Sequence, residues 1–204
     1  MHKTRILGWL ILLMAVLSSC GGDNDISNEA EYLQYINEFT AGTISKHSSV
    51  IVKLANPSAK FNSDNKEKAV KGIFEFSPKI EGEARWIDQY TIEFKPSELL
   101  KNGQEYVATF HLSDVQEVAD KKNKDFKFPF KVIEQSLSLR TEMPVYKEDG
   151  SVEVNGILQL ADREEQDVIA QLVSATMDGK SYAIEWGSII PQTFGCLSHV
   201  KSAI

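Results

Sequence analysis

The chain has 204 residues and carries 29 acidic against 22 basic side chains, which gives a formal net charge of −7. An acidic excess of this size argues against a surface that binds nucleic acid or anionic lipid headgroups. Hydrophobic residues make up 42% of the sequence and aromatic residues 9%, so the composition is that of a globular protein and not of a long disordered tether.

Residues 1–20 have the features of a bacterial lipoprotein leader. Lys3 and Arg5 precede an apolar run over residues 6–17, which is the order of a secretory signal peptide. The run is too short to span a bilayer comfortably. It leads into a segment that resembles a bacterial lipobox, formed by Leu17, Ser18, Ser19 and Cys20. We expect a signal peptide over residues 1–19, cleavage before Cys20 and diacylglycerol on the Cys20 sulfur. The alternative is an ordinary signal peptide with a chance cysteine.

Lipid on Cys20 predicts where the protein resides. Two or three buried acyl chains hold a protein at a membrane far more firmly than one. The expected location is therefore the bacterial cell envelope, at the periplasmic face or the cell surface. The only other cysteine is Cys196. If Cys20 carries lipid, no disulfide can form within the chain, and packing alone must stabilise the fold.

Residues 20–38 are predicted to hold the lipidated cysteine and a linker. The stretch 21–31 is small and polar, which suits a flexible spacer. Asn28 can cap a short helix that has Glu31 at its third position. The residues that continue this helix at helical spacing are Leu33, Ile36 and Asn37.

From Thr43 onward apolar residues alternate with polar ones, which is the pattern of half-buried antiparallel strands. Turn signals separate most of these strands, so we predict an all-β fold with an immunoglobulin-like β-sandwich over residues 39–133. Pro129 on an outward-facing position predicts an edge strand. Trp86 is expected between the sheets, with a ligand-stacking role as the alternative. The expected core residues are Trp86, Tyr90, Ile92, Phe94, Tyr106 and Phe110.

Three successive segments together form one pattern of strands and turns. They are FTAGTIS at 39–45, FEFSPKIEGEARWIDQYTIEFKP at 74–96 and LLKNGQEYVATFHLSDV at 99–115. A strand ends in Ser-Pro-x-Ile-x-Gly, a Trp-x-Asp hairpin follows, and a proline turn leads to Leu-x-x-Gly-x-x-Tyr. This pattern resembles the first macroglobulin-type domain of the bacterial α2-macroglobulin family. The resemblance covers residues 39–133 and implies a sandwich of macroglobulin type.

The resemblance also implies a role in protease defence. Family members are long chains that offer a bait region to a protease, change shape on its cleavage and entrap it, so proteases are the expected targets of the parent protein. Many form an internal thioester from a Cys-Gly-Glu-Gln stretch. Cys20 is followed by Gly-Gly-Asp and Cys196 by Leu-Ser-His, so no thioester is expected in this chain. The lipobox agrees with the resemblance, because bacterial members are commonly membrane-anchored lipoproteins.

Residues 134–187 resemble, less closely, the start of a second macroglobulin-type domain. Asp162 with Glu165 is expected to cap a helix, which carries Val168, Ile169, Leu172 and Val173. The region is only about half as long as a sandwich domain of ~100 residues, so one face of its sheet should lack apolar cover. The side chains concerned are Leu137, Leu139, Val152, Val154, Leu158 and Leu160.

Both the alternation and the resemblance stop after residue 187. Residues 188–204 are expected to be a divergent, disordered tail in which Cys196 is an exposed thiol. Such an abrupt loss indicates a frameshift or an early stop in the coding sequence, with a divergent loop as the alternative. The chain is accordingly interpreted as an N-terminal fragment of a longer protein.

No pattern for catalysis, metal binding or cofactor binding is found. The four histidines lie far apart in the sequence, at His2, His47, His111 and His199. Neither a nucleophile elbow nor a phosphate-binding loop occurs. The acidic pairs are expected to be solvated, namely Glu164 with Glu165 and Asp120 with Asp125. We expect a protein that is not an enzyme, with no cofactor, no metal, no nucleic-acid partner and no small-molecule substrate.

Two functions from different classes stay open. The first is the N-terminal part of a membrane-anchored α2-macroglobulin-like protease inhibitor, acting as the membrane-proximal scaffold of the protease trap. The second is an immunoglobulin-like spacer or adhesion domain of a bacterial surface lipoprotein, because bacterial repeats of that type share the Leu-x-x-Gly-x-x-Tyr pattern. The Trp-x-Asp hairpin and the start of a second domain favour the first.

Overall fold

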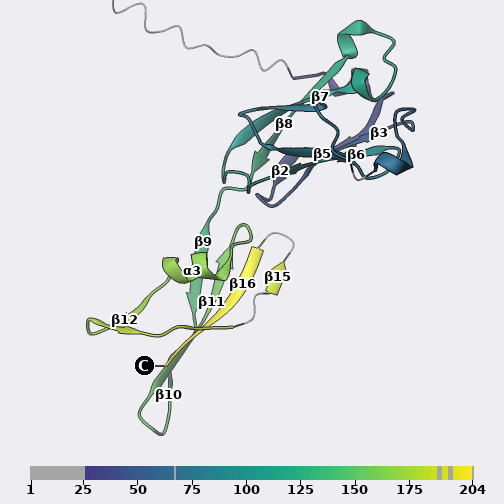
Figure 1. The fold of residues 1–204 in the computed structure, drawn as a ribbon. Helices are drawn as coiled ribbons and strands as arrows, with labels where there is room; N and C mark the ends of the chain where they lie inside the picture. Colours follow the sequence, from purple (N-terminus) through teal and green to yellow (C-terminus); the bar gives the residue numbers. More distant parts are fainter. Residues whose placement is uncertain (1–25, 67, 188–189, 193–194, 204) are drawn as a thin grey trace, which may run out of the picture.

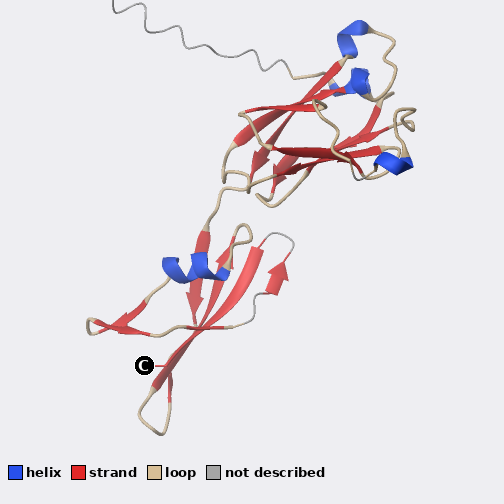
Figure 2. Ribbon diagram, in the orientation of Figure 1, coloured by secondary structure: helices blue, strands red, loops and turns tan. Residues whose placement is uncertain are grey.

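The computed structural model describes residues 26–66, 68–187, 190–192 and 195–203, and it folds them into two β domains joined by a short connection (Figure 1). Strands dominate both domains and the helices are short (Figure 2). The all-β class predicted from the alternating pattern is confirmed.

The first domain is an antiparallel β-sandwich of immunoglobulin-like type. One sheet has the order β1-β3-β6-β5 and consists of β1 (Ile36–Phe39), β3 (Val50–Leu54), β6 (Thr91–Pro96) and β5 (Gly82–Trp86). The other has the order β2-β8-β7-β4 and consists of β2 (Gly42–Ile44), β8 (Asp125–Val132), β7 (Glu105–His111) and β4 (Phe74–Ser77). All neighbours are antiparallel except β2 and β8. These orders match the ABED and GFC sheets of immunoglobulin domains. Short 3-10 helices lie in the connections, namely η2 (Ser63–Asn65), η3 (Leu112–Asp114) and η4 (Lys121–Asn123).

The two sheets of the first domain enclose one apolar core. Strands such as β3, β6, β7 and β8 direct every second residue into it, as the period-two pattern predicts. In β7 and β8 the buried residues are Tyr106, Ala108, Phe110, Phe126, Phe128, Phe130 and Val132. Full burial of one large apolar side chain contributes about 1.5–3 kcal/mol, so these two strands supply much of the stability of the sandwich.

The sandwich begins earlier in the chain than the predicted residue 39. Tyr32, Tyr35 and Ile36 are buried in its core. The N–H of Ser27 donates to the Lys127 carbonyl at 3.0 Å, which ties the entering chain to β8. The linker assigned to residues 20–38 is therefore too long. The polar composition of this segment hides its three core side chains, and their spacing of i, i+3 and i+4 is typical of a helix although Ile36 lies in β1.

A single helical turn, α2 (Glu29–Tyr32), lies at the start of the domain. Asn28 caps it as predicted, since its side chain accepts a hydrogen bond from the Ala30 N–H at 3.3 Å. The predicted continuation of the helix is wrong, because Ile36 already belongs to β1 and pairs there with Leu54.

Pro129 does not mark an edge strand, because β8 lies between β2 and β7. However, β2 pairs only with the last three residues of β8, from Phe130 onward. On the same side of β8, the Lys127 N–H donates to Ser27 Oγ at 2.9 Å. Pro129 falls between these two contacts, so its missing N–H costs no ladder bond.

The second domain is built around β11 (Val152–Leu160). On one side β11 pairs with β9 (Leu137–Thr141) and β10 (Val145–Tyr146), and on the other with β16 (Gly195–Ala203). β16 pairs in turn with β14 (Glu185–Trp186) and β15 (Ile190–Gln192). The remaining elements are α3 (Gln166–Leu172) and the hairpin of β12 (Ala175–Met177) and β13 (Lys180–Tyr182).

β16 corrects the expectation of a disordered tail over residues 188–204. It runs antiparallel to β11, from the pair Glu153 and Ala203 to the pair Gln159 and Leu197. The segment has few apolar residues, so its local alternation is weak. Its partner is the second edge of β11, which lies far away in the sequence. Cys196 is predicted to be an exposed thiol, but its side chain is not among those that the structure describes.

The predicted helix of the second domain is present as α3, but its cap is different. Glu165 occupies the N-cap position, whereas Asp162 hydrogen bonds to Ser45 of the first domain. A local pattern of cap residues cannot reveal a partner so distant in the sequence.

The apolar face of the second sheet is covered only in part. Ile169 on α3 packs on Leu158 and Leu160, and all three are buried. The predicted lack of cover is therefore wrong for these two leucines. It holds for Leu137 and Leu139 on β9, which are 42% and 46% exposed.

Candidate functional site

The predicted lipidation site, Cys20 with Leu17, Ser18 and Ser19, lies outside the described residues. Among the helices that the structure describes, none is long and apolar enough to cross a membrane. Across the same part of the chain, no three His, Cys, Asp or Glu side chains come together as metal ligands could.

Five of the six predicted core residues lie in the apolar core of the sandwich, namely Trp86, Ile92, Phe94, Tyr106 and Phe110. Trp86 is 5% exposed, so its ring has little surface left for stacking on a ligand. A concavity of about 520 Å³ next to it is lined by Lys60, Lys68, Lys71 and Asp114, among others.

Tyr90 is the exception, because it is only half-buried. It precedes β6 and belongs to the turn of the β5–β6 hairpin. Asp88 shapes this turn, since its Oδ1 accepts hydrogen bonds from the N–H groups of Tyr90 at 2.7 Å and Thr91 at 2.8 Å. The alternation that correctly predicts Ile92 and Phe94 therefore does not extend back to Tyr90.

The residues that carry the family resemblance have structural roles in the sandwich. Ser77 ends β4, and Gly82 begins β5 at a point where a Cβ atom would overlap the Lys95 carbonyl oxygen and the Phe94 ring. Gly103 has a φ of 70° in the turn before β7, a conformation that favours glycine. These positions shape strands and turns and offer no reactive group.

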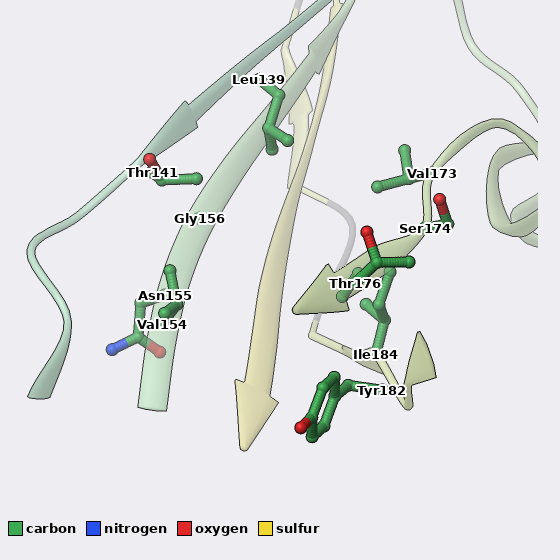
Figure 3. Close-up of a pocket in the computed structure, with 11 residues that line it drawn as sticks. Leu139, Thr141, Val154, Asn155, Gly156, Val173, Ser174, Thr176, Tyr182 and Ile184 are labelled. Carbon is green, nitrogen blue, oxygen red and sulfur yellow. The ribbon is translucent and has the colours of Figure 1, made fainter. Parts of the chain in front are cut away.

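A groove of about 290 Å³ crosses the apolar face of the second domain (Figure 3). Leu139 and Thr141 of β9 and Val154 of β11 form one wall. The opposite wall comes from the segment between α3 and β14, where Val173 and Ile184 lie. α3 covers one end of this sheet face, over Leu158 and Leu160, and the groove lies over the part of the same face that α3 leaves uncovered.

The chemistry of the groove favours apolar contact. Its polar lining consists of hydroxyl and amide groups, from Thr141, Asn155, Ser174, Thr176 and Tyr182. Neither a carboxylate nor a cationic side chain is among its lining residues. Such a surface can accept an apolar side chain or a small apolar ligand.

Gly156 lies on the floor of the groove, on β11. A Cβ atom there would come within 3.3 Å of the Arg140 carbonyl oxygen and 3.4 Å of the Leu139 Cδ1 atom. The sequence pattern predicts Leu139 and Val154 as side chains without full apolar cover, but it does not predict a groove. A further signal is a glycine inside a strand pattern, which often marks a close approach of another chain segment or a ligand.

His111 lies among ionisable groups of the first domain. Its Nδ1 lies 2.6 Å from Asp125 Oδ1 and its Nε2 lies 3.6 Å from Glu75 Oε1. Partial burial disfavours the charged ring, but the hydrogen bond and the charge of Asp125 outweigh it and raise the pKa of His111. Within the described residues no hydroxyl or thiol hydrogen bonds to His111, so the cluster does not resemble a nucleophilic triad.

No family model matches the chain, and no curated protein matches it. Among solved structures, L,D-transpeptidase 3 from Mycobacterium tuberculosis with a faropenem-derived adduct aligns with a TM-score of 0.35 and 14% identity, over 52% of this chain and 40% of that one. An L,D-transpeptidase from Mycobacterium tuberculosis H37Rv aligns with a TM-score of 0.36 and 13% identity, over 76% of this chain and 59% of that one.

This chain thus spans about half the length of the solved structures that it matches. TM-scores this low carry no inference about the activity of the chain.

Proposed function

We propose that this chain is the membrane-proximal, N-terminal part of a lipid-anchored bacterial α2-macroglobulin-like protease inhibitor, and that it serves as a scaffold of the protease trap. The observation that carries the proposal is the order of features along the chain. A lipobox ending at Cys20 is followed by a short spacer, by a sandwich with the Ser-Pro-x-Ile-x-Gly and Trp-x-Asp pattern, and by a second β domain.

The geometry of the first domain is suited to a scaffold. Its core is continuous from Tyr32 to Val132, and its N-terminal end is tied to β8 through Ser27. A lipid on Cys20 would therefore hold the sandwich within a few residues of the membrane surface. The resemblance assigns capture to other parts of a longer protein, so this part needs no reactive group.

An immunoglobulin-like spacer or adhesion domain of a surface lipoprotein is the second candidate. The strand orders β1-β3-β6-β5 and β2-β8-β7-β4 favour it, because sandwiches of this type occur in many adhesion proteins. The fold alone does not discriminate between the candidates, since one fold hosts many functions.

An antibody against residues 39–133 tests the proposal in the bacterium that produces the protein. We expect it to detect an envelope protein several times longer than 204 residues, whose mobility on a native gel changes after brief exposure to trypsin. Detection of a short lipoprotein whose native mobility is unaffected by trypsin would instead support the spacer or adhesion role.

A further inference from the structure

The two domains do not share an apolar core. Among the described residues, one buried apolar cluster lies wholly in the first domain, and the other consists of Leu158, Leu160 and Ile169 with their neighbours in the second. The contacts between the domains are instead polar. They join residues 45–47, which follow β2, to residues 162–164, which lie between β11 and α3.

Asp162 is the centre of this contact and is only 5% exposed. Its Oδ1 accepts a hydrogen bond from Ser45 Oγ at 2.7 Å, and its Oδ2 accepts one from the Lys46 N–H at 2.8 Å. A hydroxyl and a backbone N–H of the first domain thus donate to the two oxygens of one carboxylate, and such charge-assisted hydrogen bonds are strong. Lys46 is itself fixed in the first domain, because its carbonyl accepts the Leu100 N–H at 3.0 Å.

Glu164 adds a second carboxylate to the same site. Its Oε1 lies 2.5 Å from Lys46 Nζ, and the two side chains are 11% and 9% exposed. Partial burial disfavours the ionised carboxyl, but hydrogen bonds from Lys46 and Gln135 outweigh it and lower the pKa of Glu164. Glu164 is therefore ionised at neutral pH. Nearby, His47 Nε2 lies 3.1 Å from the Arg163 carbonyl oxygen.

Gln135, in the connection between the domains, holds the 162–164 segment in position. Its Oε1 accepts the Asp162 N–H and its Nε2 donates to the Asp162 carbonyl, both at 3.0 Å. Polar contacts of this kind between domains are compatible with rigid-body motion, because no apolar surface has to be exposed when they open. A buried charge without its partner is strongly unfavourable, so the contact should open as a whole and not one bond at a time.

We infer that residues 45–47 form a carboxylate-recognition site of the first domain, and that the Asp162-Arg163-Glu164 segment of the second domain is its resident ligand. Together they act as a latch. When the latch is closed, the second domain has one orientation on the first. When it is open, both domains stay folded and pivot about residues 133–136. The inference does not depend on the proposed function.

Distance measurements between two spin labels test the latch in the full chain. Glu83 on β5 and Lys180 on β13 are exposed and belong to different domains. Nitroxides attached there through keto-bearing amino acids leave both cysteines unmodified. We expect one narrow distance distribution for the otherwise unaltered chain and a distribution at least twice as broad for Asp162→Ala. Glu165→Gln removes an exposed neighbouring carboxylate and should leave the width unchanged.

Lys46→Met provides a second variant on the other side of the contact, in case Asp162→Ala does not fold as judged by circular dichroism. It should also broaden the distribution, because Glu164 loses its cation. A broad distribution in the unaltered chain would overturn the inference. A width that stays narrow in every folded variant of Asp162 and Lys46 would overturn it as well.

Discussion

The Phe61 ring packs edge-on against Trp86, with ring centroids 5.8 Å apart and an angle of 71° between the ring planes. Phe61 belongs to the long connection between β3 and β4, whereas Trp86 ends β5. The connection therefore closes one side of the sandwich over the indole. Trp86 is a structural residue of the core, which agrees with its burial.

Replacement of Trp86 by alanine should destabilise the first domain by about 3–5 kcal/mol, because it removes a large buried ring and leaves a cavity. That is close to the whole stability of a small domain. Urea unfolding followed by far-UV circular dichroism measures the loss. Ile51→Ala on an exposed position of β3 is the matched control and should change stability by no more than about 0.5 kcal/mol. Equal effects of the two substitutions would contradict the role assigned to Trp86.

The burial of Leu158 predicts that the second domain can be destabilised without unfolding the first. Among the side chains that the structure describes, the buried core of the second domain consists of Leu158, Leu160 and Ile169. Leu158→Ala should cost about 2–5 kcal/mol and unfold this domain while the sandwich stays intact. Leu139→Ala on the neighbouring strand is the control, since that side chain is 46% exposed. We expect the heat-capacity trace of Leu158→Ala to lose one of two unfolding transitions. A single transition that shifts as a whole would mean that the domains unfold together.

The exposed apolar face of β9 predicts self-association at high concentration. Leu137 and Leu139 lie on the free edge of the second sheet, next to the groove, and such edges invite pairing with another chain. Leu139→Lys should lower the weight-average mass measured by sedimentation equilibrium. Leu99→Lys places the same charge on an exposed leucine of the first domain and should have no effect. If both variants associate like the unaltered chain, β9 is not the associating surface.

The contact between His111 and Asp125 predicts a pH dependence. The folded-state pKa of His111 is raised above the ordinary value of 6.5. The charged ring therefore adds stability that is fully present below pH 6.5 and is lost as the pH rises through the folded-state pKa. Asp125→Asn should lower the pKa of His111, which NMR titration of the ring protons measures directly. An unchanged titration curve would show that Asp125 does not control the ring.

The strands of the sandwich could be predicted because each strand is determined by the residues of its own segment. Alternation in segments such as 105–111 and 91–96 places the buried side chains correctly, and turn residues such as Asp88 and Gly103 separate the strands. The same reasoning fails at Tyr90, where a turn interrupts the alternation, and at Tyr32, where core side chains enter from a polar segment.

The rest depends on partners that are distant in the sequence. β16 is a strand because β11 offers it a second edge, although the segment itself shows little alternation. Asp162 was expected to cap a helix from its local pattern, yet it hydrogen bonds to Ser45, 117 residues away. The groove also escaped prediction, because its walls come from β9, β11 and the segment after α3. The local signals are Gly156 and the expected lack of apolar cover at Leu139 and Val154.

Anchoring through Cys20 predicts how the protein partitions between membrane and solution. Acyl chains contribute about 0.8 kcal/mol for each buried methylene group, and removal of the attachment site removes this contribution altogether. Cys20→Ala should therefore move the protein from the detergent phase to the aqueous phase in a Triton X-114 separation. Recovery of the variant in the detergent phase would contradict the lipoprotein assignment.

Retention of a protease at the membrane tests the central proposal most directly. Fluorescently labelled trypsin is added to spheroplasts that produce the protein from its natural gene, and membranes are separated from the soluble fraction. We expect the label to sediment with the membranes, and to move into the soluble fraction when the gene carries Cys20→Ala. If labelled trypsin forms a complex with the protein neither in the membrane fraction nor in the soluble fraction, the chain is not part of a protease trap.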